Sequence, residues 1–224
     1  MTENSRAIGL FGGTFDPVHN GHLRVALDAL DGLGLAEVRL LPARQNPLRE
    51  IPGASAGQRR DLLVAAVAGE PGLRVDAREL ERDGPSYTVD TLASLRDELG
   101  VTQPLVLMLG GDAFTGLTGW HRWRELFDLA HVVVLQRPGH TAKLAPELAV
   151  ETDARGTDDG ADLHAQAAGR VMFWRVTQLE ISSTDIRARI AAGRSIRYLV
   201  PDPVHDTIQR LDLYRAADPA RARA

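Results

Sequence analysis

Residues 12–22 read GGTFDPVHNGH and lie between an apolar run, Ala7–Phe11, and a longer amphipathic segment, Gly21–Leu33. The apolar run has the composition of a buried strand. The later segment repeats apolar residues at i, i+3, i+4 and i+7, which predicts a helix. Glycines let a backbone approach a ligand closely, and a helix N-terminus offers unpaired N–H groups to an anion. The stretch therefore predicts a phosphate-binding turn between the first strand and first helix of an α/β fold.

Beyond this turn, short apolar runs alternate with helical patterns, as in βαβ units. Further strands are predicted at 37–41, 73–75, 105–109, 132–135 and 171–176, and further helices at 57–68, 88–99, 183–192 and 203–213. The runs 105–109 and 132–135 do not alternate with polar residues, which is typical of central strands buried on both faces. We expect a Rossmann-like parallel sheet with helices on both faces.

We expect a single domain over residues 1–224, with a core at about 7–213. Residues 139–170 are rich in Ala, Gly and Asp and have weak periodicity, so they are predicted to form a variable insertion. The last residues, 218–224, are expected to fray.

Composition narrows the class of protein but not its chemistry. The chain has 224 residues, 44% hydrophobic and 25% charged, as in ordinary globular domains. Its net charge of −4 gives no general footprint for nucleic acid or an anionic membrane. The absence of cysteine excludes disulfides and thiolate chemistry. No apolar run reaches the roughly 18 residues of a membrane span, and the polar start does not resemble a signal peptide. We expect a cytoplasmic protein that binds neither nucleic acid nor membrane.

The turn also carries side chains suited to phosphate. Thr14 offers a hydroxyl, and His19 and His22 flank the start of the helix. A glycine pair or a histidine taken alone is more often structural. The sequence has no Walker-type phosphate loop, and it lacks the Gly-x-Gly-x-x-Gly pattern of a dinucleotide-binding dehydrogenase.

The complete stretch resembles the signature of the His-x-Gly-His nucleotidyltransferase superfamily, and its GGTFDPxHxGH form is similar to bacterial nicotinate-nucleotide adenylyltransferases. The resemblance extends from about Ala7 to Pro203. It implies transfer of the adenylyl group of ATP to nicotinate mononucleotide, giving deamido-NAD and pyrophosphate. It assigns catalysis to Thr14, His19 and His22, and ATP binding to Gly12, Gly13, Phe15 and His22.

Two further segments are similar to parts of the family that surround the nucleotides. Residues 85–92, PSYTVDTL, resemble a helix start at which Thr88 lies beside the nicotinate ring. Thr88 or Ser86 is also a candidate helix cap. Gly110 and Asp112 resemble a turn whose aspartate faces the bound nucleotide, although an aspartate in a turn needs no ligand.

The stretch 120–123, WHRW, resembles the segment in which a tryptophan stacks on nicotinate. Trp120 is the candidate for that contact, and Trp123 is expected in the core. His121 and Arg137 are further candidates for binding the mononucleotide.

A second signature, residues 181–187, ISSTDIR, resembles the start of a helix that binds the triphosphate. Hydroxyls at a helix N-terminus can cap the helix or donate to phosphate, and an arginine can clamp a phosphate bidentately. Ser182, Ser183 and Arg187 are the ATP-binding candidates, while Ser182 and Asp185 could instead form a capping pair without a ligand.

The loop after the second strand departs from the family pattern. Many relatives have a histidine there, whereas residues 42–49 read PARQNPLR. Arg44 and Arg49 are candidate replacements that would assist the pyrophosphate.

The expected substrates are ATP and nicotinate mononucleotide, with Mg²⁺ held through the ATP phosphates and water and by no metal ligands of the chain. Whether the protein is a monomer or a homo-oligomer stays open. Two alternatives also stay open: a nucleotidyltransferase that adenylylates phosphopantetheine or makes a CDP-alcohol, and a nucleotide-sensing regulator without catalysis.

Overall fold

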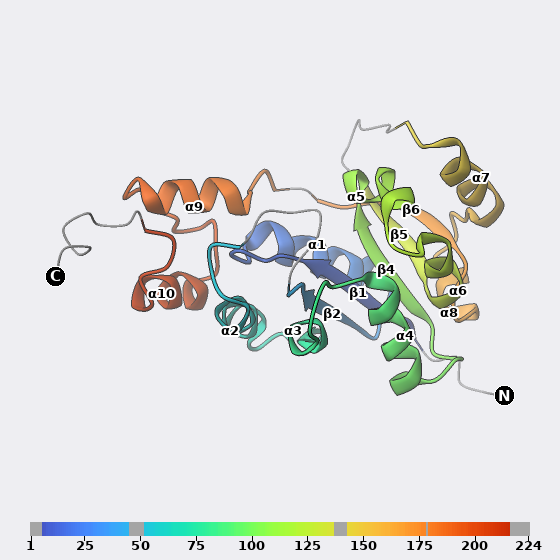
Figure 1. The fold of residues 1–224 in the computed structure, drawn as a ribbon, viewed down its shortest axis with the longest axis horizontal. Helices are drawn as coiled ribbons and strands as arrows, with labels where there is room; N and C mark the ends of the chain where they lie inside the picture. The colour runs from blue at the N-terminus through green and yellow to red at the C-terminus, as the bar shows by residue number, and fades with distance from the viewer. Residues whose placement is uncertain (1–5, 45–51, 137–142, 178, 216–224) are drawn as a thin grey trace.

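The computed structural model describes residues 6–44, 52–136, 143–177 and 179–215, and it contains one six-stranded sheet in the order β3-β2-β1-β4-β5-β6 (Figure 1). Every neighbouring pair of strands is parallel. The strands are β1 (Ile8–Gly13), β2 (Glu37–Pro42), β3 (Leu73–Val75), β4 (Leu105–Gly110), β5 (His131–Gln136) and β6 (Val171–Arg175). The predicted Rossmann-like sheet is confirmed, and each predicted strand is present to within one residue or two.

The helices connect successive strands and close the C-terminal part of the described chain. They are α1 (Asn20–Gly32), α2 (Ala56–Val67), α3 (Arg78–Glu81), α4 (Thr88–Leu99), α5 (Gly111–Thr115), α6 (Leu126–Leu129), α7 (Pro146–Arg155), α8 (Asp162–Ala165), α9 (Ser183–Ala191) and α10 (Asp202–Arg210), with 3₁₀ turns at Leu117–Gly119 and Trp123–Glu125. Figure 1 shows α2, α9 and α10 grouped at one end of the molecule. Across the described residues, every helix is too short or too polar to cross a membrane.

Two apolar cores cover the two faces of the sheet. Along β4, Leu105, Leu107 and Leu109 belong to the core shared with α4 and α6. The intervening Val106 and Met108 belong to the core shared with α1 and α2. Because successive side chains of a strand point to opposite faces, an unbroken apolar run fills both cores. The predicted burial of β4 on both faces is thus confirmed.

The strand order reverses at the centre of the sheet, and this reversal positions the site. From β1 the chain proceeds outward to β2 and β3, then returns to β4 on the other side of β1. Connections therefore leave β1 and β4 in opposite directions and open a crevice at the carboxyl ends of these strands. The turns after Gly13 and Gly110 both lie at this crevice.

The segment predicted as an insertion has a structural role. Residues 143–169 contain α7 and α8, in which Leu148 and Leu163 are fully buried. Parallel neighbouring strands require a crossover connection, and this segment joins β5 to β6. The structure shows helices where the sequence shows little periodicity, because the two helices are short and each buries few apolar residues; that this segment is a variable insertion stays a prediction. Residues 137–142 and the terminal segment 218–224 lie outside the described residues.

Candidate active site

A cavity of about 1030 Å³ lies at the carboxyl ends of the central strands. Helices α1, α4, α5 and α9 all begin at its wall. Apart from Arg44, every predicted site residue within the described part of the chain lines this one cavity: Gly12, Gly13, Thr14, Phe15, His19, His22, Thr88, Gly110, Asp112, Trp120, His121, Ser182, Ser183 and Arg187. Helix N-termini carry unpaired N–H groups and a positive dipole end, so the cavity favours anions although the chain is acidic.

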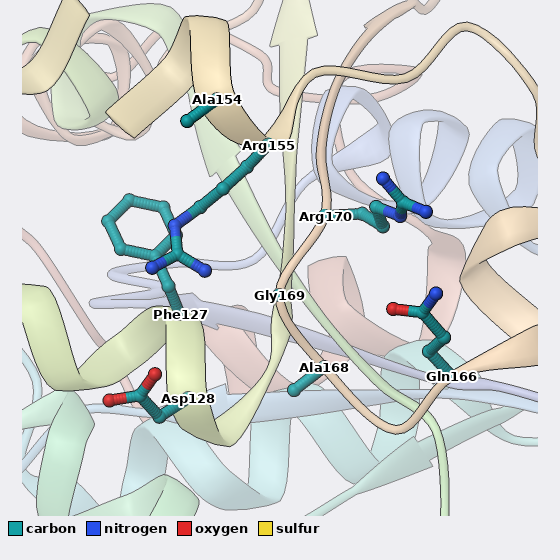
Figure 2. A pocket seen from close by; sticks show the side chains of 8 residues that line it. All are labelled: Phe127, Asp128, Ala154, Arg155, Gln166, Ala168, Gly169 and Arg170. Atoms are coloured by element: carbon teal, nitrogen blue, oxygen red, sulfur yellow. The ribbon is translucent and has the colours of Figure 1, made fainter. Parts of the chain in front are cut away.

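A second depression, of about 470 Å³, lies at the opposite edge of the sheet, where β5 and β6 begin (Figure 2). Its two arginines are not arranged as an anion clamp. The Arg155 guanidinium lies 5.1 Å from the Phe127 ring centre and bonds to Glu151 at 2.8 Å. Figure 2 shows the Arg170 side chain extending away on the other side of Gly169. Ligands of parallel α/β sheets bind at the carboxyl ends of the strands, so the larger cavity is the candidate active site.

The turn between β1 and α1 has a tightly determined shape. Phe15 has a φ of 50°, and it is 2% exposed. A Cβ atom at Gly13 would come within 3.0 Å of the Phe15 ring, so a larger residue would displace that ring. Phe15 also packs edge-on against His22, with ring centres 5.0 Å apart. The Phe15 ring is therefore a core side chain that supports the turn. If Phe15 contacts ATP as predicted, it does so through its backbone.

His19 and His22 form a stacked pair at the start of α1, with ring centres 3.6 Å apart. The backbone N–H of His19 donates to Nδ1 of His22 at 3.3 Å. A neutral His22 that accepts at Nδ1 must carry its proton on Nε2. Nδ1 of His19 is buried and has no partner within the described protein. The pair therefore presents imidazole groups that can donate to a phosphate oxygen.

Both imidazoles are neutral in the free protein near pH 7. Burial lowers the pKa of His19 to about 4. Burial, and then the neighbouring His19, lowers the pKa of His22 well below its usual value. A neutral N–H donor can stabilise charge that develops on a phosphoryl group without an ion pair in the ground state.

We predict that the histidine pair makes the fold sensitive to acid. A pKa lowered by folding means that the unfolded chain binds more protons below pH 6.5, so stability is complete above that value and is lost toward pH 4. His19 alone should remove about 2 kcal/mol between pH 7 and pH 5. Urea unfolding of wild type and His19→Asn at both pH values tests this. An equal loss of stability in the two proteins would contradict the prediction.

Helix α9 is attached to the same turn through its first residues. The Ser182 hydroxyl accepts the backbone N–H of Asp185 at 3.1 Å, so Ser182 caps the helix as the alternative interpretation proposed. The Ser183 hydroxyl donates to the Pro17 carbonyl at 2.9 Å, which occupies its proton within the protein. Arg187 lies one turn later, and its side chain is 31% exposed to the cavity.

The other side of the cavity has an aromatic wall. His121 lies against Tyr87, with ring centres 4.6 Å apart, and Trp120 lines the cavity beside them. Trp123 is 8% exposed, which confirms its expected place in the core. This wall provides flat surfaces suited to a pyridine ring.

The start of α4 differs from the prediction. Tyr87 is the N-cap residue, and no side chain caps the helix. The predicted cap at Ser86 or Thr88 is therefore wrong. The Ser86 hydroxyl instead accepts the backbone N–H of Arg44 at 3.1 Å, because the loop after β2 lies against it. Thr88 occupies the first turn of α4 and faces the cavity.

Three further candidates have different outcomes. Asp112 is exposed at the cavity, in the first turn of α5, where a plain turn was predicted. The Arg44 guanidinium bonds to the Arg82 carbonyl and to Asp83, and it does not line the cavity. The structure therefore gives no support to Arg44 as a pyrophosphate ligand. Arg49 and Arg137 lie outside the described residues.

Comparison with known proteins agrees with this geometry. A family model described as cytidylyltransferase-like matches residues 10–189. A "probable nicotinate-nucleotide adenylyltransferase" of Halorhodospira halophila is 50% identical over 96% of this chain and 98% of its own length. One of Pseudomonas putida is 49% identical over 94% of this chain and 96% of its own length. The chain belongs to the nicotinate-nucleotide adenylyltransferase family.

The fold is shared with more distant solved structures. Plasmodium falciparum nicotinic acid mononucleotide adenylyltransferase complexed with NaAD matches 93% of this chain and 97% of that one, with a TM-score of 0.69 and 16% identity. The relatives of about 50% identity confirm the family resemblance stated from the two signatures, and this structure confirms the fold.

Sequence reasoning missed a buried polar cluster beside the phosphate-binding turn. Asp16 is 4% exposed and Arg59 is 1% exposed. Arg59 donates to the carbonyls of Thr14 and Ala43, each at 2.7 Å, and Asp16 accepts the Tyr214 hydroxyl at 2.9 Å. Asp16 stands in the quoted turn, which was the one available signal. Arg59 and Tyr214 come from distant segments, and no spacing in the sequence connects them to the turn.

Proposed function

We propose that this protein transfers the adenylyl group of ATP to nicotinate mononucleotide and releases deamido-NAD and pyrophosphate. The observation that carries the proposal is the shared cavity. It joins the histidine pair and Arg187, which suit a triphosphate, to Thr88 and Trp120, which suit a pyridine nucleotide. Relatives about half identical along nearly the whole chain are named for this activity.

The triphosphate fits between the starts of α1 and α9. Backbone N–H groups of the turn and of the start of α9 can donate to its oxygens, whereas at the start of α1 the N–H groups of His19 and Asn20 are already bonded within the protein. Arg187 supplies a guanidinium from the α9 side, and Asp112 at the end of β4 lies where it can accept a hydrogen bond from the nucleoside. The ATP then spans the crevice from β4 to α9.

The reaction requires positioning more than acid–base chemistry. The 5′-phosphate of the mononucleotide attacks the α-phosphorus in line, and pyrophosphate leaves. A phosphate monoester is already anionic near neutral pH, so no strong general base is needed. His19 and His22 stabilise the α-phosphoryl charge through their N–H groups, and Thr14 adds a hydroxyl.

The start of α4 supports the acid form of the mononucleotide. No side chain caps this helix, so the first-turn N–H groups beside Thr88 are available to a carboxylate. Trp120 and His121 provide the aromatic surface for the ring. A carboxylate at a helix N-terminus gains charge-assisted hydrogen bonds that a neutral carboxamide does not.

Mg²⁺ is part of the proposal as an ion carried by the ATP phosphates and water. Among the described residues, no group of three or more His, Asp or Glu side chains is arranged to hold a metal. Of the cavity carboxylates, Asp16 is already bonded to backbone N–H groups and Tyr214, and Glu79 accepts the Thr91 hydroxyl, whereas Asp112 is exposed. The ion would supply neutralisation of the triphosphate charge, and the chain would hold the phosphates in place.

We expect kcat/KM with ATP and Mg²⁺ to be about 10- to 100-fold higher for nicotinate mononucleotide than for nicotinamide mononucleotide. A coupled assay of pyrophosphate release measures both. Phosphopantetheine in place of the mononucleotide is the control for another nucleotidyltransferase. Preferred turnover of phosphopantetheine would contradict the substrate assignment, and binding of both nucleotides without pyrophosphate release would indicate a regulator.

A further inference from the structure

Three successive segments of the phosphate-binding turn are fixed by side chains from outside it. Arg59 of α2 donates to the Thr14 carbonyl, Arg187 of α9 donates to the Asp16 carbonyl at 2.7 Å, and Ser183 donates to the Pro17 carbonyl. The turn and the start of α9 therefore form one hydrogen-bonded unit.

The Asp16 carboxylate lies at the centre of that unit. Its Oδ2 accepts the Gly53 N–H at 2.8 Å, and its Oδ1 accepts the Ala54 N–H at 3.0 Å and the Tyr214 hydroxyl at 2.9 Å. The Arg187 guanidinium lies 3.5 Å from Oδ2. A buried carboxylate needs hydrogen-bond donors for its lone pairs. If it loses a neutral donor, it attracts the Arg187 guanidinium more strongly.

Tyr214 reaches this carboxylate from the far end of the described chain, after α10. Its ring lies against Gly53, where a Cβ atom would come within 3.2 Å of the ring and 3.6 Å of the Arg187 side chain. Burial, and then the adjacent Asp16, raises the pKa of the Tyr214 hydroxyl well above its usual value, so the group remains a donor.

We propose that Tyr214 is a positioning residue for ATP: its hydroxyl satisfies Asp16 and thereby keeps Arg187 from closing its 3.5 Å contact with Oδ2, so that the N–H groups of Arg187 that do not bond to the Asp16 carbonyl can bind the triphosphate. This inference rests on the proposed function, since it assigns Arg187 to ATP. Without the hydroxyl, Oδ1 of Asp16 keeps a single neutral donor. The carboxylate then draws Arg187 into a closer ion pair and competes with the phosphates for it.

The test is Tyr214→Phe, which removes one oxygen and keeps the ring against Gly53. We expect KM for ATP to rise about tenfold, with kcat and KM for nicotinate mononucleotide changed less than about twofold. Tyr198→Phe is the matched control, because Tyr198 is 84% exposed, and it should leave all three constants unchanged. Since KM does not depend on the fraction of folded enzyme, a loss of stability alone cannot imitate this result.

A second comparison tests whether Tyr214 acts through Arg187. In an Arg187→Lys background, the further change Tyr214→Phe should alter KM for ATP less than about twofold, because the group that Tyr214 positions is already lost. An unchanged KM for ATP in the single variant, or an equal tenfold rise in both backgrounds, would overturn the inference. A wild-type protein that does not adenylylate nicotinate mononucleotide would instead refute the proposed function.

Discussion

Replacing His22 by Ala should lower kcat about 10²- to 10³-fold while the protein remains folded. His22 accepts the His19 N–H at Nδ1, so its remaining nitrogen carries the donor hydrogen. Burial keeps this imidazole neutral by lowering its pKa, and the ring stacks on His19 at the start of α1. Its loss removes a donor placed where charge develops on the α-phosphoryl group. Steady-state kinetics with saturating ATP and nicotinate mononucleotide measure the effect.

Two amide substitutions separate the donor from the packing of the ring. An Asn at position 22 can accept the His19 N–H, as Nδ1 does, but its amide does not reach the position of Nε2. A Gln can place its amide near Nε2. We therefore expect His22→Asn to be as inactive as His22→Ala, and His22→Gln to recover part of kcat. His205→Ala is the control, because His205 pairs with Asp206 outside the cavity lining. Near-wild-type kcat in His22→Ala would remove the central assignment.

The parts of the fold that could be predicted are those determined by local pattern. The runs at 105–109 and 132–135 are apolar at every position, which is typical of strands buried on both faces. The alternation of strands and helices then predicts a parallel sheet, but the order of its strands was not predicted. Helices α3, α5 and α6 were missed, because four or five residues are too few to display a helical period.

Site residues could be predicted where a reactive side chain stands at the start of a predicted helix. His19, His22 and Arg187 reach the cavity because His19 is the N-cap residue of α1, and His22 and Arg187 lie in the first two turns of helices that begin there. The cap of α4 could not be predicted, since Ser86 is bonded to a loop that precedes it by some forty residues. The local sequence gives no information about such a tertiary hydrogen-bond partner.

The burial of Arg59 could not be predicted from the sequence either. In the sequence Arg59 is one of two adjacent arginines in a predicted helix, and nothing distinguishes it from its neighbour. In the structure Arg59 is 1% exposed, whereas the Arg60 side chain is 51% exposed. Arg59 lies three and four residues before the fully buried Leu62 and Leu63, so it shares their face of α2. Arg60, in contrast, lies four residues before the exposed Val64. Every residue from 62 to 68 is apolar, so the sequence does not show which face of this helix is buried.

Arg59→Met should therefore lower the free energy of unfolding by about 3–5 kcal/mol, and Arg60→Met by less than about 1 kcal/mol. Arg59 donates to three carbonyls, those of Thr14, Ala43 and Arg44, at 2.7, 2.7 and 3.2 Å. Met fills much of the same volume but leaves these acceptors without their donor. Arg60 bonds only to Asp61 among the described residues, in an exposed ion pair.

Urea unfolding followed by circular dichroism gives both free energies, and equal losses in the two variants would show that the buried bonds contribute no more than an exposed pair.

The Thr14 carbonyl connects this stability to catalysis. Without its bond to Arg59, the Thr14 carbonyl no longer holds the turn that carries Thr14 and precedes His19. We therefore expect the Arg59 variant to have a lower kcat as well, measured at a urea concentration low enough that the protein is still folded. Arg60→Met should retain its kcat. A destabilised but fully active Arg59→Met protein would mean that the histidine pair and the remaining bonds of Asp16 and Pro17 hold the turn without Arg59.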